Sequence, residues 1–117
     1  MRAPIVRYSS HAQAAPGANT NIFTAITPSQ GTAQVRVFIS LATGSVFNLR
    51  LTDGTDAYTI KLNSGTALTA GVAYAFDIPL SAVPTEDNTK TITYSLQVAT
   101  DSVIQHLEVW ELAEPVA

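Results

Sequence analysis

Few residues in this sequence have types and spacing suited to catalysis or metal binding. The 117 residues include two histidines and no cysteine. His106 and Glu108 are two positions apart, a spacing that places both side chains on one face of a strand. His11 lies far upstream. A catalytic zinc site usually has three protein ligands, so the pair His106 and Glu108 indicates a surface or interface histidine beside an acidic neighbour.

Paired carboxylates, which glycosidases use, occur twice, as Asp53 with Asp56 and as Glu86 with Asp87. Both pairs occur where acidic side chains ordinarily cap turns. The stretch DGTD resembles the start of a calcium loop, but the twelfth position of that loop would be Ser64, which is not acidic. No serine lies in a Gly-x-Ser-x-Gly turn. We therefore expect no catalytic residues, no metal and no cofactor, in a protein that is not an enzyme.

The charge of the chain argues against a nucleic-acid partner. The formal net charge is −3, and the six basic residues are scattered, whereas a phosphate backbone requires a concentrated positive patch. Charged residues make up 13% of the chain, against about 25% in an average soluble domain. Such a surface is easily desolvated, which favours a protein that covers itself with its own copies or a partner. A β protein with a merely neutral surface has the same composition.

The length corresponds to one domain that needs no disulfides for stability. The absence of cysteine fits synthesis in a reducing cytoplasm. No apolar run approaches the ~20 residues that span a bilayer. The N-terminal stretch MRAPIVRYSSHAQAAPGANT also lacks the apolar core, roughly 7–15 residues long, of a secretory signal. We therefore expect no membrane partner.

The segments that carry or flank His106 and the acidic residues considered above have the pattern of β-strands. From Asn21 onward, turn signals recur about every 8–12 residues, as in an all-β sandwich or barrel. Large apolar residues alternate with polar or small ones, which indicates strands with one buried face. Asp-Gly within TDGT predicts a hairpin. The predicted strands are 21–26, 33–40, 45–51, 56–62, 72–80, 91–99 and 103–112. The predicted core residues are Val35, Val37, Ile39, Phe47, Leu49, Leu51, Tyr58, Ile60, Tyr74, Phe76, Ile78, Tyr94 and Leu96.

The predicted fold class is all-β: a single antiparallel β-sandwich, jelly-roll-like and of seven to eight strands, over residues 21–112. Residues 1–20 are predicted as an extended N-terminal arm and residues 113–117 as a short C-terminal tail. The arm is rich in Ala, Ser, Gln and Pro, which cannot form a core alone. It is either a disordered tail or a segment that becomes ordered on a neighbouring subunit.

The last predicted strand is apolar on both faces: Ile104, Trp110 and Leu112 lie on one face, and Leu107 and Val109 lie on the other. Such a strand is either central in a sandwich or covered by another subunit. Tryptophan is favoured at interface hot spots and also serves as a stacking platform for sugars. The predicted interface residues are Ile5, Val6, Tyr8, His106 and Trp110.

Three stretches resemble a known class of proteins: TNIFTAITPSQGTAQVRVFIS, LNSGTALTAGVAYAFDIPL and TITYSLQVATDSVIQHLEVWEL. They are similar to small β-sandwich virion structural proteins of tailed bacteriophages and related viruses, of the decoration (cement), tail or minor capsid type. The resemblance covers roughly residues 19–112, and its motifs are structural. It implies a homo-oligomer, commonly a trimer, that binds the major capsid protein or another virion protein. It further implies synthesis in the host cytoplasm, location in the virion, and no catalytic residues.

Two functions follow as hypotheses. The first is a capsid decoration or cement subunit that stabilises the particle through oligomeric surface contacts. The alternative is a small carbohydrate-binding β-sandwich module in which Trp110 or a tyrosine stacks on a sugar ring. A stable trimer that binds capsids favours the first hypothesis, and a monomer with affinity for saccharides favours the second.

Overall fold

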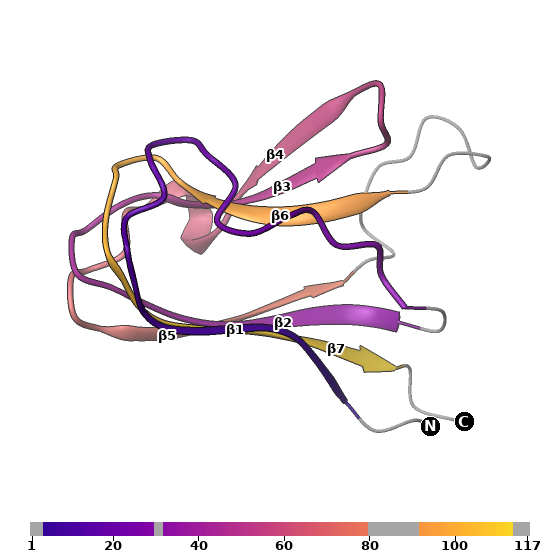
Figure 1. Ribbon diagram of the computed structural model, residues 1–117, viewed down its shortest axis with the longest axis horizontal. Coiled ribbons are helices and arrows are strands. Elements are labelled where there is room, and N and C mark those ends of the chain that lie inside the picture. Colours follow the sequence, from indigo (N-terminus) through magenta and orange to yellow (C-terminus); the bar gives the residue numbers. More distant parts are fainter. Residues whose placement is uncertain (1–3, 30–31, 80–91, 114–117) are drawn as a thin grey trace.

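The computed structural model describes residues 4–29, 32–79 and 92–113, which fold as two antiparallel sheets packed face to face (Figure 1). In order across the first sheet, the strands are β1 (Ile5–Gln13), β7 (Ile104–Ala113), β2 (Thr32–Leu41) and β5 (Ala73–Pro79). In order across the second sheet, they are β4 (Ala57–Lys61), β3 (Phe47–Thr52) and β6 (Thr93–Val98). A short 3₁₀ turn, η1 (Asn63–Gly65), follows β4. The predicted all-β sandwich is confirmed.

The segment 19–26, which contains the first predicted strand, is not a regular strand but lies along β6. Asn19 donates its N–H to the carbonyl of Val98 (2.7 Å), and Ile26 and Tyr94 exchange two backbone hydrogen bonds (2.8 and 2.9 Å). The segment therefore covers the outer edge of β6. If this segment is counted as the second of eight strands in chain order, the four-stranded sheet has the order 1-8-3-6. The other sheet, extended by the segment beside β6, has the order 2-7-4-5. This is the strand order of a jelly roll.

The core lies between the sheets and follows the predicted alternation. Nine of the predicted core residues are buried: Val35, Val37, Ile39, Phe47, Leu49, Leu51, Ile78, Tyr94 and Leu96. The other four, Tyr58, Ile60, Tyr74 and Phe76, are only partly buried. They belong to β4 and β5, which have a neighbouring strand on one side only within the described ranges, so no strand of those ranges covers the other flank of these side chains. The Phe76 ring nevertheless stacks on Phe47, with ring centroids 6.4 Å apart.

The N-terminal region differs from the predicted arm, because residues 5–13 form β1 within the four-stranded sheet. β1 pairs with β7 from Ile5 opposite Glu111 to Gln13 opposite Ile104. The physical reason is that adding a strand to an existing sheet edge needs backbone partners and few apolar side chains. The composition of the segment therefore does not keep it out of the domain. Of the predicted tail, Ala113 ends β7, and 114–117 lie outside the described residues.

The predicted hairpin joins β3 and β4, with Thr52 paired to Ala57. The Asp53 carboxylate accepts hydrogen bonds from the N–H groups of Thr55 (2.9 Å) and Asp56 (2.7 Å). Gly54 has a φ of 93°, a conformation that glycine adopts without strain. Asp53 therefore caps the turn, as expected for an acidic residue at this position. The other acidic pair, Glu86 and Asp87, lies outside the described residues.

Candidate functional site

The outer face of the four-stranded sheet carries aromatic and aliphatic side chains that the core does not use. On adjacent strands, Arg36 lies opposite Trp110 and Phe38 opposite Glu108. On the far side of β7, Val6 of β1 lies opposite Trp110. Phe38 is 36% exposed and Val6 is 45% exposed. We call this surface the outer face; within the described residues, nothing covers its apolar groups.

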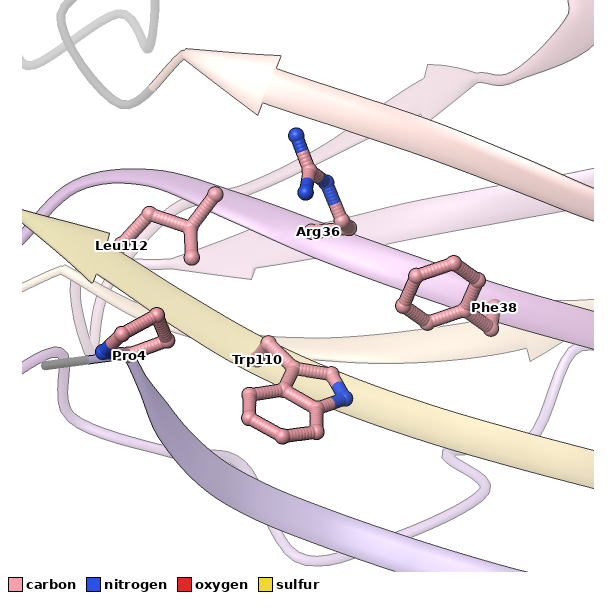
Figure 2. Close-up of a pocket in the computed structure, with 5 residues that line it drawn as sticks. All are labelled: Pro4, Arg36, Phe38, Trp110 and Leu112. Atoms are coloured by element: carbon pink, nitrogen blue, oxygen red, sulfur yellow. The ribbon is translucent and has the colours of Figure 1, made fainter.

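A groove of about 230 Å³ crosses the outer face between β1, β7 and β2 (Figure 2). It is lined by Pro4, Arg36, Phe38, Trp110 and Leu112. Figure 2 shows the indole of Trp110 between Pro4 on one side and Phe38 on the other, with Arg36 on the neighbouring strand. The walls are mostly hydrocarbon with a single cation. Such a groove suits an apolar side chain or a planar ring that carries an oxygen acceptor.

The cation of the groove is held in place by Asp77 on β5. Arg36 donates Nε to Oδ1 (2.6 Å) and Nη2 to Oδ2 (3.1 Å) of this carboxylate, in a bidentate pair. The hydrogen bond from Arg36 lowers the pKa of Asp77. Both side chains are about half exposed, so the pair contributes little to stability. Its consequence is that the guanidinium has a fixed position at the rim of the groove.

A row of polar contacts runs along the outer face beside the groove. His11 of β1 lies opposite His106 of β7, with the two Nδ1 atoms 3.3 Å apart. His106 Nε2 lies 2.5 Å from Glu108 Oε2, and Trp110 Nε1 donates to Glu108 Oε1 (2.9 Å). These hydrogen bonds, that of His106 first, lower the pKa of Glu108. The row connects the histidine pair to the tryptophan of the groove through one carboxylate.

A second glutamate of β7, Glu111, points into the core and is fully buried. Its Oε1 accepts hydrogen bonds from Arg7 Nη1 (3.0 Å), the Ser29 N–H (3.0 Å) and the Thr32 hydroxyl (3.1 Å). Its Oε2 accepts one from the Tyr94 hydroxyl (2.7 Å). Burial raises the pKa of this carboxyl, but the hydrogen bonds outweigh burial and lower the pKa overall. Burial, together with Glu111, raises the pKa of Tyr94.

The contacts of Glu111 join β1, β7, the start of β2 and β6 of the opposite sheet. A catalytic acid must reach a substrate, whereas this carboxylate has no exposed surface and its donors come from four parts of one chain. The geometry therefore gives Glu111 a structural role.

No three histidine, cysteine or acidic side chains gather into a metal-binding group in the part of the chain that the structure describes. In the same residues, no helix is long and apolar enough to cross a membrane.

The structure brings three of the predicted interface residues, Val6, His106 and Trp110, onto the outer face. Tyr8 is not with them, because its ring stacks on Phe23 with centroids 4.6 Å apart. Its hydroxyl donates to Gln13 Oε1 (2.8 Å). Ile5, the fifth predicted residue, is exposed on β1 and pairs with Glu111 through the backbone.

Two side-chain clusters, one structural and one on the outer face, were missed by the sequence-based prediction. Glu111 lies on the same face of β7 as Leu107 and Val109, because the three residues are two positions apart. A carboxylate on a buried face predicts hydrogen-bond partners from other elements, so the sequence did contain a signal for this cluster. The contact between His11 and His106 had no local signal. It depends on the pairing of β1 with β7, and the two residues are 95 positions apart.

Comparison with known proteins gives no relative: no protein-family model, curated protein or solved structure matches this chain. The features that bear on function are therefore those of the chain itself, namely the jelly-roll strand order, the apolar outer face and the histidine row.

Proposed function

We propose that this protein is a structural subunit that assembles through the outer face of its four-stranded sheet, as a capsid decoration or cement subunit does. The observation that carries the proposal is the groove formed by Pro4, Phe38, Trp110 and Leu112 on a face that no described part of the chain covers. A soluble sandwich requires only the inner face of each sheet to be apolar. Exposed aromatic groups gathered on the other face are typical of an interface.

Three further properties support this function. Few charges would have to be desolvated on assembly, because charged residues are 13% of the chain. Among the described residues, β1 and β5 end the four-stranded sheet and pair on one side only, so each offers an edge for strand pairing with another chain. Jelly rolls are common among viral capsid domains, although they also occur in lectins. The fold alone therefore does not decide the function, and the preference for the capsid role rests on the resemblance expected from three sequence stretches.

The proposal includes partners and a location. The protein acts without catalysis as a homo-oligomer, with a trimer as the first expectation, and binds the major capsid protein or another virion protein. It is made in the host cytoplasm and becomes part of the virion. Nucleic acid and membranes are not among its partners.

The test is the molar mass of the purified protein by light scattering, together with its binding to particles that lack it. We expect the wild type to be oligomeric and to bind. The double variant Phe38→Ser/Trp110→Ser should be monomeric and should bind weakly, with an unchanged circular dichroism spectrum. The matched control is Val103→Ser, because Val103 is 43% exposed but lies before β7 and outside the groove. A monomeric wild type that does not bind particles would overturn the proposal.

A second candidate function is carbohydrate binding, because Trp110 lies in the groove beside Phe38 with a fixed guanidinium at its rim. An aromatic ring on a sheet face can stack on a sugar, and an arginine can donate hydrogen bonds to its hydroxyl groups. Titration with oligosaccharides should then quench the fluorescence of Trp110, the only tryptophan in the chain. A monomer that binds saccharides and loses this binding on Trp110→Ala would support this function against the first.

A further inference from the structure

We infer that His11 and His106 together form a binding site for a divalent transition-metal ion. Their Nδ1 atoms face each other across β1 and β7 at 3.3 Å. Two nitrogens that each lie ~2.05 Å from a zinc ion at the tetrahedral angle are ~3.3 Å apart. The two Nδ1 atoms are therefore at the separation that a shared metal ion requires.

The second ring nitrogen of His106 is already held in the way that metal-binding histidines usually are. Nε2 of His106 lies 2.5 Å from Glu108 Oε2. Since the carboxylate can only accept, the neutral imidazole must donate Nε2–H to it, which leaves the lone pair of Nδ1 directed at His11. Such carboxylate–histidine pairs orient ligands and make them more basic. Trp110 fixes the carboxylate in turn, by donating to its other oxygen.

The same geometry defines what the metal replaces. Without a metal, the contact between the two Nδ1 atoms contains one proton, so His11 carries it and donates to His106. When a metal binds, that proton leaves Nδ1 and a proton is taken up from water at Nε2, so His11 changes tautomer and no net proton is released. The ring of His11 is exposed, so water can accept the new N–H donor.

The site is open on the solvent side. No third histidine, cysteine or acidic ligand joins the pair among the described residues, and the His106 side chain is 41% exposed. Two of four tetrahedral positions are then left for water or for groups of another molecule. Imidazole ligands suit zinc, nickel and copper ions rather than magnesium or calcium. This inference stands independently of the proposed function, because it requires only one chain.

The test is titration of tag-free protein with ZnCl₂ and NiCl₂, followed by calorimetry and by nitrogen-15 NMR of the imidazoles. We expect saturable binding of one ion per chain, with large shifts of the Nδ1 resonances of both histidines. His11→Asn and His106→Asn should each lose this binding. Glu108→Gln, which keeps both ligands, should weaken it about 10–100-fold.

The matched control is Asp77→Asn, which removes a carboxylate from the outer face away from the histidine pair. It should bind the metal like the wild type. Because His11 is exposed, His11→Asn should keep the melting temperature of the metal-free wild type, so that lost binding is not lost folding. Absence of saturable binding by the wild type would overturn the inference. The inference would also be overturned if His11→Asn still bound the metal, or if only the Nε2 resonances shifted on metal binding.

Discussion

Two glutamates on β7 show how differently the two faces of the four-stranded sheet are built. Glu111 on the inner face has no exposed surface and accepts four hydrogen bonds. Glu108, three positions earlier on the outer face, has a side chain that is 31% exposed and interacts with His106 and Trp110. Both carboxyls have a lowered pKa, so the direction of the shift does not distinguish their roles.

What distinguishes them is the cost of removing a partner. In the core, removal of Arg7 leaves the charge of the fully buried Glu111 without solvent, which is strongly destabilising. On the surface, water and salt replace the lost partner, and the effect is small. The inner face should therefore determine stability, while the outer face is free to bind a partner or a metal at little cost to the fold.

The largest effect on stability should come from deletion of residues 2–13. This deletion removes β1, and with it the β1 side chains on both the inner and the outer face of the four-stranded sheet. The deletion exposes one edge of β7, uncovers the ring of Phe23, and takes Arg7 from Glu111. We expect a loss of stability at least as large as the ~3–5 kcal/mol that breaking a buried ion pair costs, measured by urea denaturation. A truncated protein with the melting temperature of the full chain would show that residues 5–13 are an arm after all.

The next largest effect should come from Glu111→Ala. The change leaves the Tyr94 hydroxyl and the Ser29 N–H without their acceptor, while the Arg7 side chain, 26% exposed, still reaches water. At about 1–3 kcal/mol for each buried donor that loses its acceptor, we expect a loss of about 2–5 kcal/mol in the free energy of unfolding. Glu108→Ala is the matched control on the same strand. If the two variants unfold at the same urea concentration, the distinction between the faces is wrong.

The pH dependence of stability should follow from the same carboxyl. The pKa of Glu111 in the folded protein lies below that of an unfolded glutamate, which is ~4.3. Its contribution to stability is therefore fully present above that pH and is lost as the pH falls through the folded-state pKa. Melting temperatures measured between pH 7 and pH 3 should fall steeply at the acid end. Glu111→Gln should have a flatter profile, and an unchanged slope would show that other groups cause the acid sensitivity.

The inner face could be predicted from the sequence wherever a strand is central. Val35 and Leu49 alternate with polar neighbours and lie on β2 and β3, which have a strand on each side, so the pattern alone identifies them as core. The same pattern overestimated the burial of Tyr74 and Phe76, because period two indicates which side of a sheet a residue faces but not whether its strand is an edge.

The candidate site was less predictable, because it is made of cross-strand contacts. Trp110 and His106 could be selected by residue type, but the groove also requires Pro4 and Phe38, which come from different parts of the chain. No periodicity indicates that β1 pairs with β7. That pairing depends on an edge that exists only once the sheet has formed.

The edge effect can be measured directly with two phenylalanines that stack on each other. Phe47 is fully buried on β3, whereas Phe76 is partly buried on β5. Phe47→Ala should cost about 3–5 kcal/mol, as buried phenylalanines do. Phe76→Ala should cost less, about 1–3 kcal/mol. Equal losses in urea denaturation would mean that Phe76 is covered in solution, for example by another copy of the protein.

The smallest effect on stability should come from Glu108→Gln. An amide of the same shape can still accept one hydrogen bond, from His106 or from Trp110, and the rest of the interaction is screened by solvent. We therefore expect a change of no more than about 1 kcal/mol, reduced further in high salt. Urea denaturation at two salt concentrations measures both quantities. A loss comparable to that of Glu111→Ala would mean that the outer face is covered in the protein as it exists in solution, and that its carboxylate is buried by assembly rather than by the fold.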